Sequence, residues 1–328
     1  MKKFYFLLLS VTWLFFHSCS REETDENFGL NSAIDLYVFG DDNERICYWK
    51  NGDRTIFPNS GDFTSAYFGI DGKDIYATGL FSLFQSGGKR EYSYWINEEK
   101  QNLNSFLNIP GNVNFYLKAF VIKNGDIYSA GYLENSSATS DLRYEYCYWK
   151  NNIKHTLFKS KYSSSDIKML VTEGDVYLAV DNGEALGFYK NLNFIPTPNR
   201  KAKYLFEHEG NIYYVGYDVS NFNAFYCKSD GSETISLPSP NFEIFSKNGN
   251  LHLKDDQKYY KNSLANLKLD VSKNFGLIKK LDVEGDNTFG IYVVDNESTQ
   301  QKIFANQAMF MQSNEIQNFK DIIAVSKK

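Results

Sequence analysis

The fold is decided by residues 115–158, which read FYLKAFVIKNGDIYSAGYLENSSATSDLRYEYCYWKNNIKHTLF. The stretch contains four runs rich in β-branched and aromatic residues, namely Phe115–Ile122, Asp126–Tyr132, Tyr144–Trp149 and Ile153–Phe158. Asparagine turns join the first pair and the last pair, and a polar loop joins the two middle runs. This order of runs and turns is typical of antiparallel hairpins. We therefore predict a four-stranded antiparallel meander.

Two pieces of this stretch recur seven times along the chain, with changes of residue between copies. One is an "I-Y" run bounded by Gly, Asn or Asp, and the other is an aromatic "Y-W-K-N" strand end. The first stands at residues 35–37, 74–76, 126–128, 175–177, 211–213, 250–252 and 290–292, and the second at 48–50, 94–96, 148–150, 188–190, 226–228, 259–261 and 303–305. Copies follow at intervals of 36–52 residues, and the mean interval lies within roughly 40–50 residues, the length of a propeller blade. The sequence predicts an all-β fold, a β-propeller of seven four-stranded blades, although the degraded sixth and seventh copies leave six or eight open.

The two ends of the repeat array complement each other. The first copy begins directly at Ile34–Gly40, the second strand of a blade, with no apolar strand before it. The last copy is followed by an additional apolar run, Ile322–Val325. An unpaired strand leaves an exposed sheet edge, and closing a ring removes such edges. We predict that the C-terminal run pairs beside Leu36–Phe39 and closes the ring.

The repeat resembles that of seven-bladed β-propellers, and more closely that of exported repeat proteins that carry the phrase "DIYxAG…YWKNG". Asp126–Gly131 and Tyr48–Gly52 match this phrase best. The resemblance covers nearly all of the chain after its leader. It implies the architecture and little about activity. WD40 signatures are missing from the sequence, which has no Trp-Asp strand end and no Gly-His pair.

The first residues resemble a bacterial lipoprotein signal. Lys2 and Lys3 precede an apolar run, Phe4–Phe16, that is too short for a permanent membrane helix. Ser18 and Cys19 follow, and then an acidic, polar run. In such signals the cysteine is lipidated and becomes the new N-terminus. Phe16 and His17 replace the more usual leucine and small residue before Ser18, and acidic residues follow just after the cysteine. In both respects the signal resembles those of surface-exported lipoproteins of the Bacteroidota.

This resemblance divides the chain into a signal peptide at residues 1–18, the lipidated Cys19 with an acidic tether at residues 19–31, and one propeller domain at residues 32–328. It implies export, membrane attachment through the lipid alone, and an outer-membrane location on the cell surface. A plain signal peptide with an incidental cysteine is the alternative.

Composition narrows the class of partner. The net charge of −5 and the pI of about 5.5 provide no basic footprint, so we expect no nucleic-acid partner. Six prolines and the lack of a Gly/Ser-rich run leave no obvious linker. We therefore expect a single domain after the leader.

The remaining cysteines, Cys47, Cys147 and Cys227, fall in equivalent strands of different repeats. Equivalent strands of separate blades lie too far apart for the Cα spacing of a disulfide, roughly 5.5 Å. We therefore predict that these cysteines are buried and reduced.

Metal and cofactor signals are weak. The mature histidines, His155, His208 and His252, belong to different repeats and lack the spacing of metal ligands. Asp282–Asn287 places oxygen-bearing side chains at alternate positions, as calcium loops do, but without the EF-hand spacing. We expect no catalytic residues, no metal site and no cofactor.

The loops between the second and third strands of a blade, and those between blades, vary in length and share one rim of the ring. Variable loops on a rigid scaffold usually carry binding. We therefore predict a ligand site on this rim near the second and third blades. The candidate residues supply aromatic rings and cations: Phe81, Phe84, Arg90, Tyr132, Arg143, Tyr217 and Phe222. The competing interpretation is that these rings are tucked against strands.

Three functions fit these observations. The first is a surface- or envelope-anchored, non-catalytic binding or scaffold propeller for a protein or glycan. The second is a propeller enzyme acting on polysaccharide, a hydrolase or lyase, whose carboxylates would converge around the central channel. The third is an envelope assembly factor that faces the periplasm. Because acidic residues such as Asp126 and Asp175 fall in turns on the tight-turn rim, the sequence favours binding.

Overall fold

The computed structural model describes residues 33–81, 89–135, 137–163, 166–181, 186–271, 276–293, 300–314 and 317–327. The predictions about the leader, including the lipidation of Cys19, lie outside these residues, as does the candidate Phe84. Everything below concerns the unit that begins at Ala33.

The described residues form seven four-stranded antiparallel sheets, which we call blades A to G. Blade A is β28 (Gln317–Ser326), β1 (Ile34–Asp42), β2 (Arg45–Lys50) and β3 (Asp53–Ile56); blade B is β4 (Phe63–Asp71), β5 (Asp74–Phe81), β6 (Tyr92–Ile96) and β7 (Glu99–Asn102); blade C is β8 (Asn114–Lys123), β9 (Asp126–Glu134), β10 (Tyr144–Lys150) and β11 (Ile153–Ser160); blade D is β12 (Asp166–Val171), β13 (Val176–Asp181), β14 (Gly187–Lys190) and β15 (Asn193–Pro196).

The other three blades follow the same order. Blade E is β16 (Arg200–His208), β17 (Asn211–Asp218), β18 (Ala224–Lys228) and β19 (Thr234–Ser236); blade F is β20 (Glu243–Lys247), β21 (Asn250–Lys254), β22 (Lys258–Lys261) and β23 (Leu267–Asp270); blade G is β24 (Leu277–Glu284), β25 (Asn287–Val293), β26 (Gln301–Ala305) and β27 (Ala308–Gln312). The described helical segments are α2 (Leu103–Phe106) and η1 (Ser140–Leu142).

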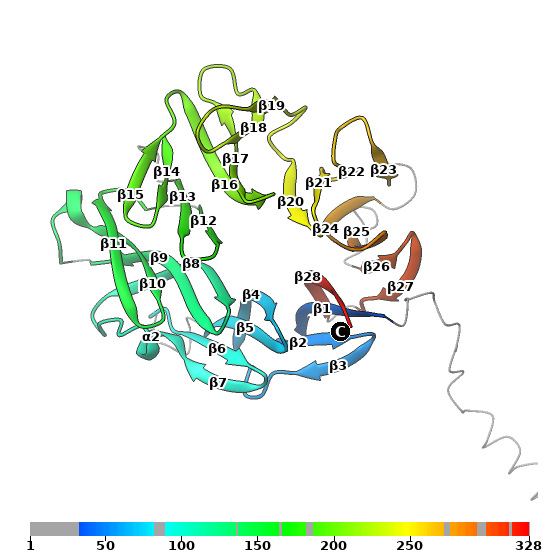
Figure 1. Ribbon diagram of the computed structural model, residues 1–328. Coiled ribbons are helices and arrows are strands. Elements are labelled where there is room, and N and C mark those ends of the chain that lie inside the picture. The colour runs from blue at the N-terminus through cyan, green and yellow to red at the C-terminus, as the bar shows by residue number, and fades with distance from the viewer. Residues whose placement is uncertain are drawn as a thin grey trace, which may run out of the picture. The chain divides into compact units, whose positions relative to one another are not determined.

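The blades stand around a common centre, with the first strand of each blade innermost (Figure 1). This arrangement confirms the predicted all-β propeller and settles the blade count at seven for the described chain. The meander predicted from residues 115–158 is blade C, and its four strands begin and end close to the predicted positions.

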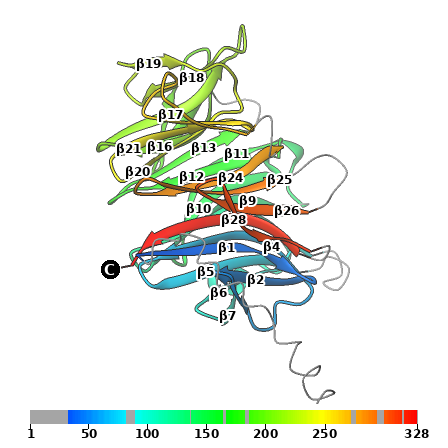
Figure 2. The ribbon, with the colours of Figure 1, turned by 90° about the vertical axis from the view of Figure 1, so that its right-hand side faces the viewer.

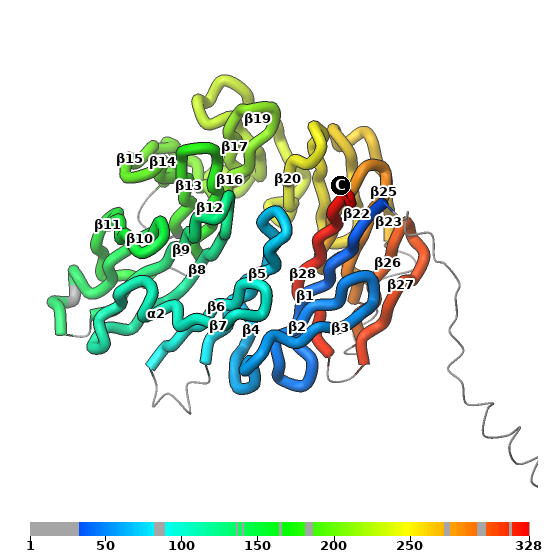
Figure 3. Tube along the Cα trace, turned by 60° about the horizontal axis from the view of Figure 1, so that its bottom comes forward, coloured from blue at the N-terminus to red at the C-terminus, as the bar shows by residue number. Residues whose placement is uncertain are grey.

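Ring closure also occurs as predicted. β28 pairs antiparallel with β1, with Ala324 opposite Leu36 and Ile322 opposite Val38. Figures 2 and 3 show the two ends of the domain side by side, the C-terminal strand in red against the N-terminal strand in blue. The last strand of the chain thus completes its first blade.

The asparagine of the "Y-W-K-N" phrase fixes the turn between the third and fourth strands. In six blades its side-chain oxygen accepts a hydrogen bond from a backbone N–H at the start of the second strand, at 2.8–2.9 Å. Its amide group donates, at 2.6–3.1 Å, to the Asp or Asn that opens the "I-Y" run in blades A, B, C, D and F, and to Asn287 at the start of β25 in blade G. The asparagine adopts φ between 46° and 65°, a left-handed conformation that Asn tolerates better than most residues. The two recurring pieces are therefore joined to each other.

The lysine of the "Y-W-K-N" phrase and the tyrosine of the "I-Y" run take part in the same arrangement in blades A, C and D. Lys150 pairs with Asp126 at 3.0 Å and its ammonium lies 5.6 Å from the centre of the Tyr128 ring. Blades A and D repeat these contacts through Lys50 and Lys190. The rest of the phrase, its Tyr-Trp pair, lies in the core.

Aromatic rings fill the space between blades. Trp149 of blade C is fully buried, 5.2 Å from Phe115, in a cluster that also contains Tyr92 and Tyr94 of blade B. Trp95 of blade B packs in the same way with Phe57 of blade A. Middle strands such as β9 are buried on both faces, while the outermost strands such as β7 are exposed.

Five innermost strands of the described chain carry a β-bulge in their N-terminal half. In four of them the extra residue is a lysine: Lys118, Lys203, Lys279 and Lys320. A bulge redirects the side chain of its extra residue. Three of these lysines donate to a backbone carbonyl of the next blade, at 2.7–3.4 Å. The bulges thus link neighbouring blades.

Cys47, Cys147 and Cys227 are buried and unpaired, as predicted. Burial raises the pKa of Cys147 to about 12 and that of Cys47 further. Thiols in this state pack as small apolar groups.

Candidate functional site

A row of aromatic rings crosses blade C near the rim that carries the longer loops. The strand register places Tyr132 opposite both Tyr116 and Tyr146, and Tyr146 opposite Phe158. Neighbouring ring centres in this row lie 4.6, 5.5 and 4.4 Å apart. The row continues to Tyr189 of blade D, 5.7 Å from Phe158. The rings form a rigid base beneath the loops.

Arg90, just before β6 of blade B, covers the inner end of this row. Its guanidinium lies 4.4 Å from the centre of the Tyr116 ring. The same ring stacks on Tyr132, with an angle of 17° between the ring planes. Tyr116 therefore contacts both an arginine and a tyrosine, which combines cation–π attraction with ring stacking. Arg90 is only half-buried, so its guanidinium is held in a fixed place while still exposed.

Glu134 holds the second arginine of the site. It accepts a hydrogen bond from the Tyr116 hydroxyl at 2.7 Å and two from Arg143, from Nε at 2.9 Å and from Nη2 at 2.5 Å. Burial alone would raise the pKa of Glu134, but the hydrogen bonds from Tyr116 and Arg143 and the charge of Arg143 lower it below its usual value. Glu134 is thus an ionised, fully engaged carboxylate. We call Arg90, Tyr116, Tyr132, Glu134 and Arg143 the blade C rim cluster.

Asn135 and Arg143 stand at the two ends of a loop beside this cluster. The Asn135 N–H donates to the Arg143 carbonyl at 3.0 Å, so the loop begins and ends at one point. Arg143 and Leu142 are exposed there, and Tyr162, whose carbonyl accepts from the Tyr146 hydroxyl, is exposed beside β11. Exposed arginine and tyrosine side chains therefore stand on a buried tyrosine base.

The cluster gathers several cations. Glu134 pairs with Arg143, Arg90 lies over the Tyr116 ring, and the Lys118 ammonium lies 5.8 Å from the centre of the Tyr132 ring. Burial lowers the pKa of Lys118, the negative charge of Asp166 opposes this, and the positive charges of Arg90 and Lys168 lower it further. In a protein with a net charge of −5, the cluster places two arginines around one carboxylate.

The cluster is suited to binding and poorly suited to proton transfer. Glu134 already accepts three hydrogen bonds, and burial raises the pKa of Tyr132 to about 12. A general acid or base needs a pKa near the working pH and a free proton path. The planar guanidinium groups of Arg90 and Arg143 instead match the geometry of carboxylate or phosphate groups.

The structure brings three of the predicted candidates together. Arg90, Tyr132 and Arg143 all belong to the blade C rim cluster. Tyr132 is buried with 4% of its surface exposed, so its ring supports the cluster from below. For this residue the competing interpretation, a ring tucked against strands, is the correct one.

The remaining described candidates lie elsewhere. Phe81 ends β5 in blade B, 5.0 Å from Phe63, beside a groove of about 330 Å³ that Lys100 also lines. Tyr217 and Phe222 stack on each other at 5.8 Å in blade E. Phe222 is 68% exposed, with a φ of 59°.

Sequence reasoning missed Tyr116, Glu134 and Lys118. Tyr116 and Lys118 stand in the first strand of the repeat and Glu134 at the end of the second. Aligning the strands of one meander by register would have placed Tyr116, Tyr132 and Tyr146 in a row. The register depends on the bulge at Lys118, which shifts the pairing by one residue and has no clear sequence signal.

The histidines of the described chain serve structural contacts. His155 stacks on Tyr148 at 4.6 Å, and His252 Nδ1 lies 2.7 Å from the Tyr259 hydroxyl. His208 Nδ1 lies 2.9 Å from Ser246 Oγ. Among the described residues, no group of three or more His, Cys, Asp or Glu side chains is placed to hold a metal ion.

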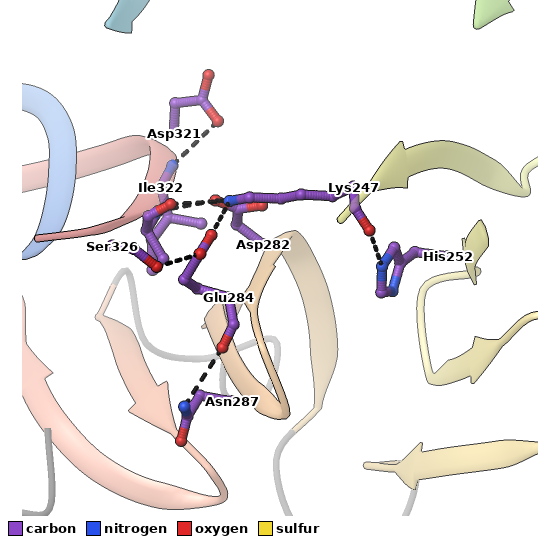
Figure 4. A network of polar contacts seen from close by, with 9 residues as sticks. Lys247, His252, Asp282, Glu284, Asn287, Asp321, Ile322 and Ser326 are labelled. Carbon is purple, nitrogen blue, oxygen red and sulfur yellow. Dashed lines mark hydrogen bonds and ion pairs between the residues drawn. The ribbon is translucent and has the colours of Figure 1, made fainter. Parts of the chain in front are cut away.

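The acidic turn Asp282–Asn287 is occupied by lysines. Lys247 of blade F lies 2.7 Å from Asp282 and 3.4 Å from Glu284, and it donates to the Ala324 carbonyl at 2.8 Å. Figure 4 shows this network joining the innermost strands of three blades. Asp286, at the turn itself, pairs with Lys261 at 3.4 Å. The lysine ammonium groups therefore take the place beside these carboxylates that a calcium ion would need.

The carboxyl group of Asp321 has a raised pKa. Burial raises its pKa, and the neighbouring charges of Asp282 and Glu243 add to this while Lys280 opposes it. Its side chain points away from the Lys247 network (Figure 4). It accepts a hydrogen bond from the Ile322 N–H at 3.0 Å.

Within the part of the chain that the structure describes, no helix is long and apolar enough to cross a membrane.

No protein-family model matches the sequence, and no curated protein matches it. Solved structures do resemble the fold. Apo AztD from Citrobacter koseri is 11% identical, with a TM-score of 0.51 over 89% of this chain and 98% of AztD. A structure from a study of two prolyl endopeptidases is 9% identical, with a TM-score of 0.51 over 90% of this chain and 51% of that one.

A puromycin-hydrolyzing peptidase of Mycobacterium tuberculosis is 10% identical, with a TM-score of 0.50 over 78% of this chain and 46% of the peptidase. The chain thus spans about half the length of the peptidases that it matches. At such low identity these likenesses extend to the fold alone, and what the chain shares with all three proteins is a β-propeller.

Proposed function

We propose that the protein is an exported lipoprotein, anchored to the outer membrane through Cys19, whose propeller is a non-catalytic binding module for a protein or glycan at the cell surface. The observation that carries the binding part is the blade C rim cluster. Its two arginines are fixed by a buried tyrosine base, so little side-chain entropy is lost when they bind. Arginine and tyrosine are also the residues most enriched at binding hot spots.

The non-catalytic part of the proposal rests on the same contacts. Glu134, the carboxylate of the cluster, has a lowered pKa and three donors. It is thus ionised and cannot donate a proton near neutral pH. The guanidinium groups of Arg90 and Arg143 favour a partner that offers carboxylate or phosphate groups.

The binding proposal is tested with a glycan array and a cross-linking pull-down on intact exporting cells, using the full chain. Arg90→Ala and Arg143→Ala should each weaken capture of the partner at least fivefold, a loss of about 1 kcal/mol. Arg45→Ala, an exposed arginine of β2 in blade A, is the matched control. Equal capture by all three variants would rule out the cluster as the binding surface.

The anchoring proposal is tested separately. Cys19→Ala should abolish incorporation of an alkyne-bearing fatty acid and release the protein from the membrane fraction. Protease treatment of intact cells should digest the wild-type chain if it is displayed on the surface. A protein that is lipidated yet protected from protease would instead favour the periplasm-facing assembly factor.

A second candidate function, an enzyme acting on polysaccharide, is favoured by Asp321. A partly buried acid with a raised pKa, near other carboxylates on innermost strands, has the properties of a general acid. Screening purified protein against polysaccharides tests this candidate, since turnover that is lost in Asp321→Asn and retained in Arg90→Ala would replace binding by catalysis.

A further inference from the structure

A groove of about 470 Å³ lies between blades E and F, on the rim with the tight turns. By chain topology this is the rim opposite the blade C rim cluster, so the groove is separate from the proposed binding surface. Its walls contain three aromatic rings. Phe206 and Tyr213 stack 5.3 Å apart, and Tyr226 meets both rings edge-on at 6.1 Å.

Two carboxylates, Glu209 and Glu233, line the same groove. The Tyr213 hydroxyl donates to Glu233 at 3.3 Å. Burial raises the pKa of Tyr213, and the charges of Glu233 and Glu209 raise it further, so the phenol stays protonated. Among the described residues that line the groove there is no lysine or arginine. His208 also lines the groove, with its Nδ1 2.9 Å from Ser246 Oγ. The groove therefore combines aromatic rings with two carboxylates that no lysine or arginine of its lining accompanies.

The equivalent groove between blades F and G has the opposite character. It encloses about 380 Å³ and is lined by Tyr259, which corresponds to Tyr226, and by Lys261, Lys268 and Asp286. Lys261 pairs with Asp286 at 3.4 Å. At this position of the fold the chain supplies its own ammonium group, and in the groove between blades E and F it does not.

The repeat itself gives an independent comparison. In blades A, C and D the ammonium of the "Y-W-K-N" lysine lies 5.3–5.7 Å from the ring centre of the "I-Y" tyrosine. In blade E the corresponding residues are Lys228 and Tyr213. The phrase begins there with Asn211 in place of Asp, and Lys228 lies 3.9 Å from Asp230 in the next turn. In the described chain, Tyr213 receives no such lysine.

We propose that the groove between blades E and F is a binding site for an organic ammonium ion. The rings of Tyr213 and Tyr226 would face the cation, since aromatic faces attract ammonium groups and quaternary ammonium ions are bound by such cages. Glu209 and Glu233 would balance its charge. The bound cation would take the place that a lysine of the chain occupies in the sister groove and in three other blades.

The test is calorimetric titration of the purified full chain with choline chloride and with lysine methyl ester, which carry the same charge on different frames. 3,3-Dimethylbutan-1-ol, the neutral counterpart of choline, is the ligand control. We expect saturable binding of at least one cation and at least about tenfold weaker binding of the neutral analogue, because the charge supplies the attraction. Equal binding of choline and its neutral analogue, or no saturable binding of either cation, overturns the proposal.

Three variants locate the site. The double variant Glu209→Gln and Glu233→Gln should weaken cation binding about tenfold while the rings stay in place. Glu233→Lys should abolish it, because the variant installs an ammonium as in the sister groove. Glu99→Gln, an exposed residue of β7 in blade B, is the matched control and should bind as the wild type does. Thermal unfolding of each variant confirms that the fold is intact, and unchanged affinity in a folded double variant also overturns the proposal.

Discussion

The side-chain amide of Asn151 donates a hydrogen bond to Asp126 at 3.0 Å across the edge of blade C. Its oxygen accepts from the Ile127 N–H at 2.9 Å, and its own N–H donates to the Ile127 carbonyl. A single residue at the end of β10 therefore bonds to three groups at the start of β9. The same contacts recur in five other blades, which explains why these letters of the repeat are kept together.

Replacing this asparagine should weaken the blade. Asn151→Gly keeps the left-handed backbone but removes both side-chain hydrogen bonds, and we expect the free energy of unfolding to fall by about 1–2 kcal/mol. Asn124→Gly is the matched control, because Asn124 also has a φ of 54° but sits in the turn between the first two strands. Urea unfolding measures both variants. Equal losses in the two would show that the side-chain contacts of Asn151 contribute nothing.

The bulge opposite Gly131 makes that glycine irreplaceable. A Cβ at this position would lie 2.1 Å from the Tyr116 carbonyl oxygen, a backbone atom that cannot move alone. We expect Gly131→Ala to destabilise the fold by about 2–3 kcal/mol, as overpacked substitutions do. Gly111→Ala, where a Cβ meets nothing within 4 Å, should leave the thermal midpoint unchanged. A stable Gly131→Ala protein would contradict the described approach of the two strands.

Ring closure depends on one strand. Deleting residues 320–328 removes most of β28 and exposes Leu36 and Val38, which are 0% and 1% exposed. We expect the truncated chain to lose its cooperative unfolding transition in circular dichroism, because the first blade would lack its innermost strand. Removing Lys328 alone is the control. An unchanged transition in the truncated chain would mean that the ring holds without this pairing.

Glu134 links stability to pH. Its pKa is lowered in the folded state from the usual 4.5, so its contribution is present above that value and is lost as the pH falls through the lower folded pKa. We expect Glu134→Gln to be less stable than the wild type at neutral pH, with the difference shrinking as the solution is acidified below the ordinary glutamate pKa. Denaturation at a series of pH values measures this. A difference that does not vary with pH would place the loss in packing alone.

Much of this fold is legible in the sequence because the repeat is a local signal. The turn asparagines, the "I-Y" runs and the unmatched strands at the two ends specify strand order, blade number and closure. The details of the site are not local. Arg90 reaches Tyr116 across a blade boundary, and Glu134 meets Arg143 across a loop of variable length. Such contacts depend on strand register and bulges, which cannot be predicted from single residues of the sequence.

The inter-blade grooves show the same limit. Lys228 and Lys261 occupy the same letter of the repeat, yet their environments differ because of turn residues such as Asp230 and Asp286. Only the folded arrangement shows which copies keep their ammonium on a ring and which do not.

The pairing of β28 with β1 also has a mechanical consequence. β1 is held by hydrogen bonds on both sides, to β28 along its whole length and to β2 over its second half. A pull at Ala33 directed along β1 would load these bonds together in shear, so no single bond would bear the force first. Force applied through an anchor ahead of Ala33 would therefore act on a strand that is paired on both sides. Blade A, which closes the ring, would bear this force.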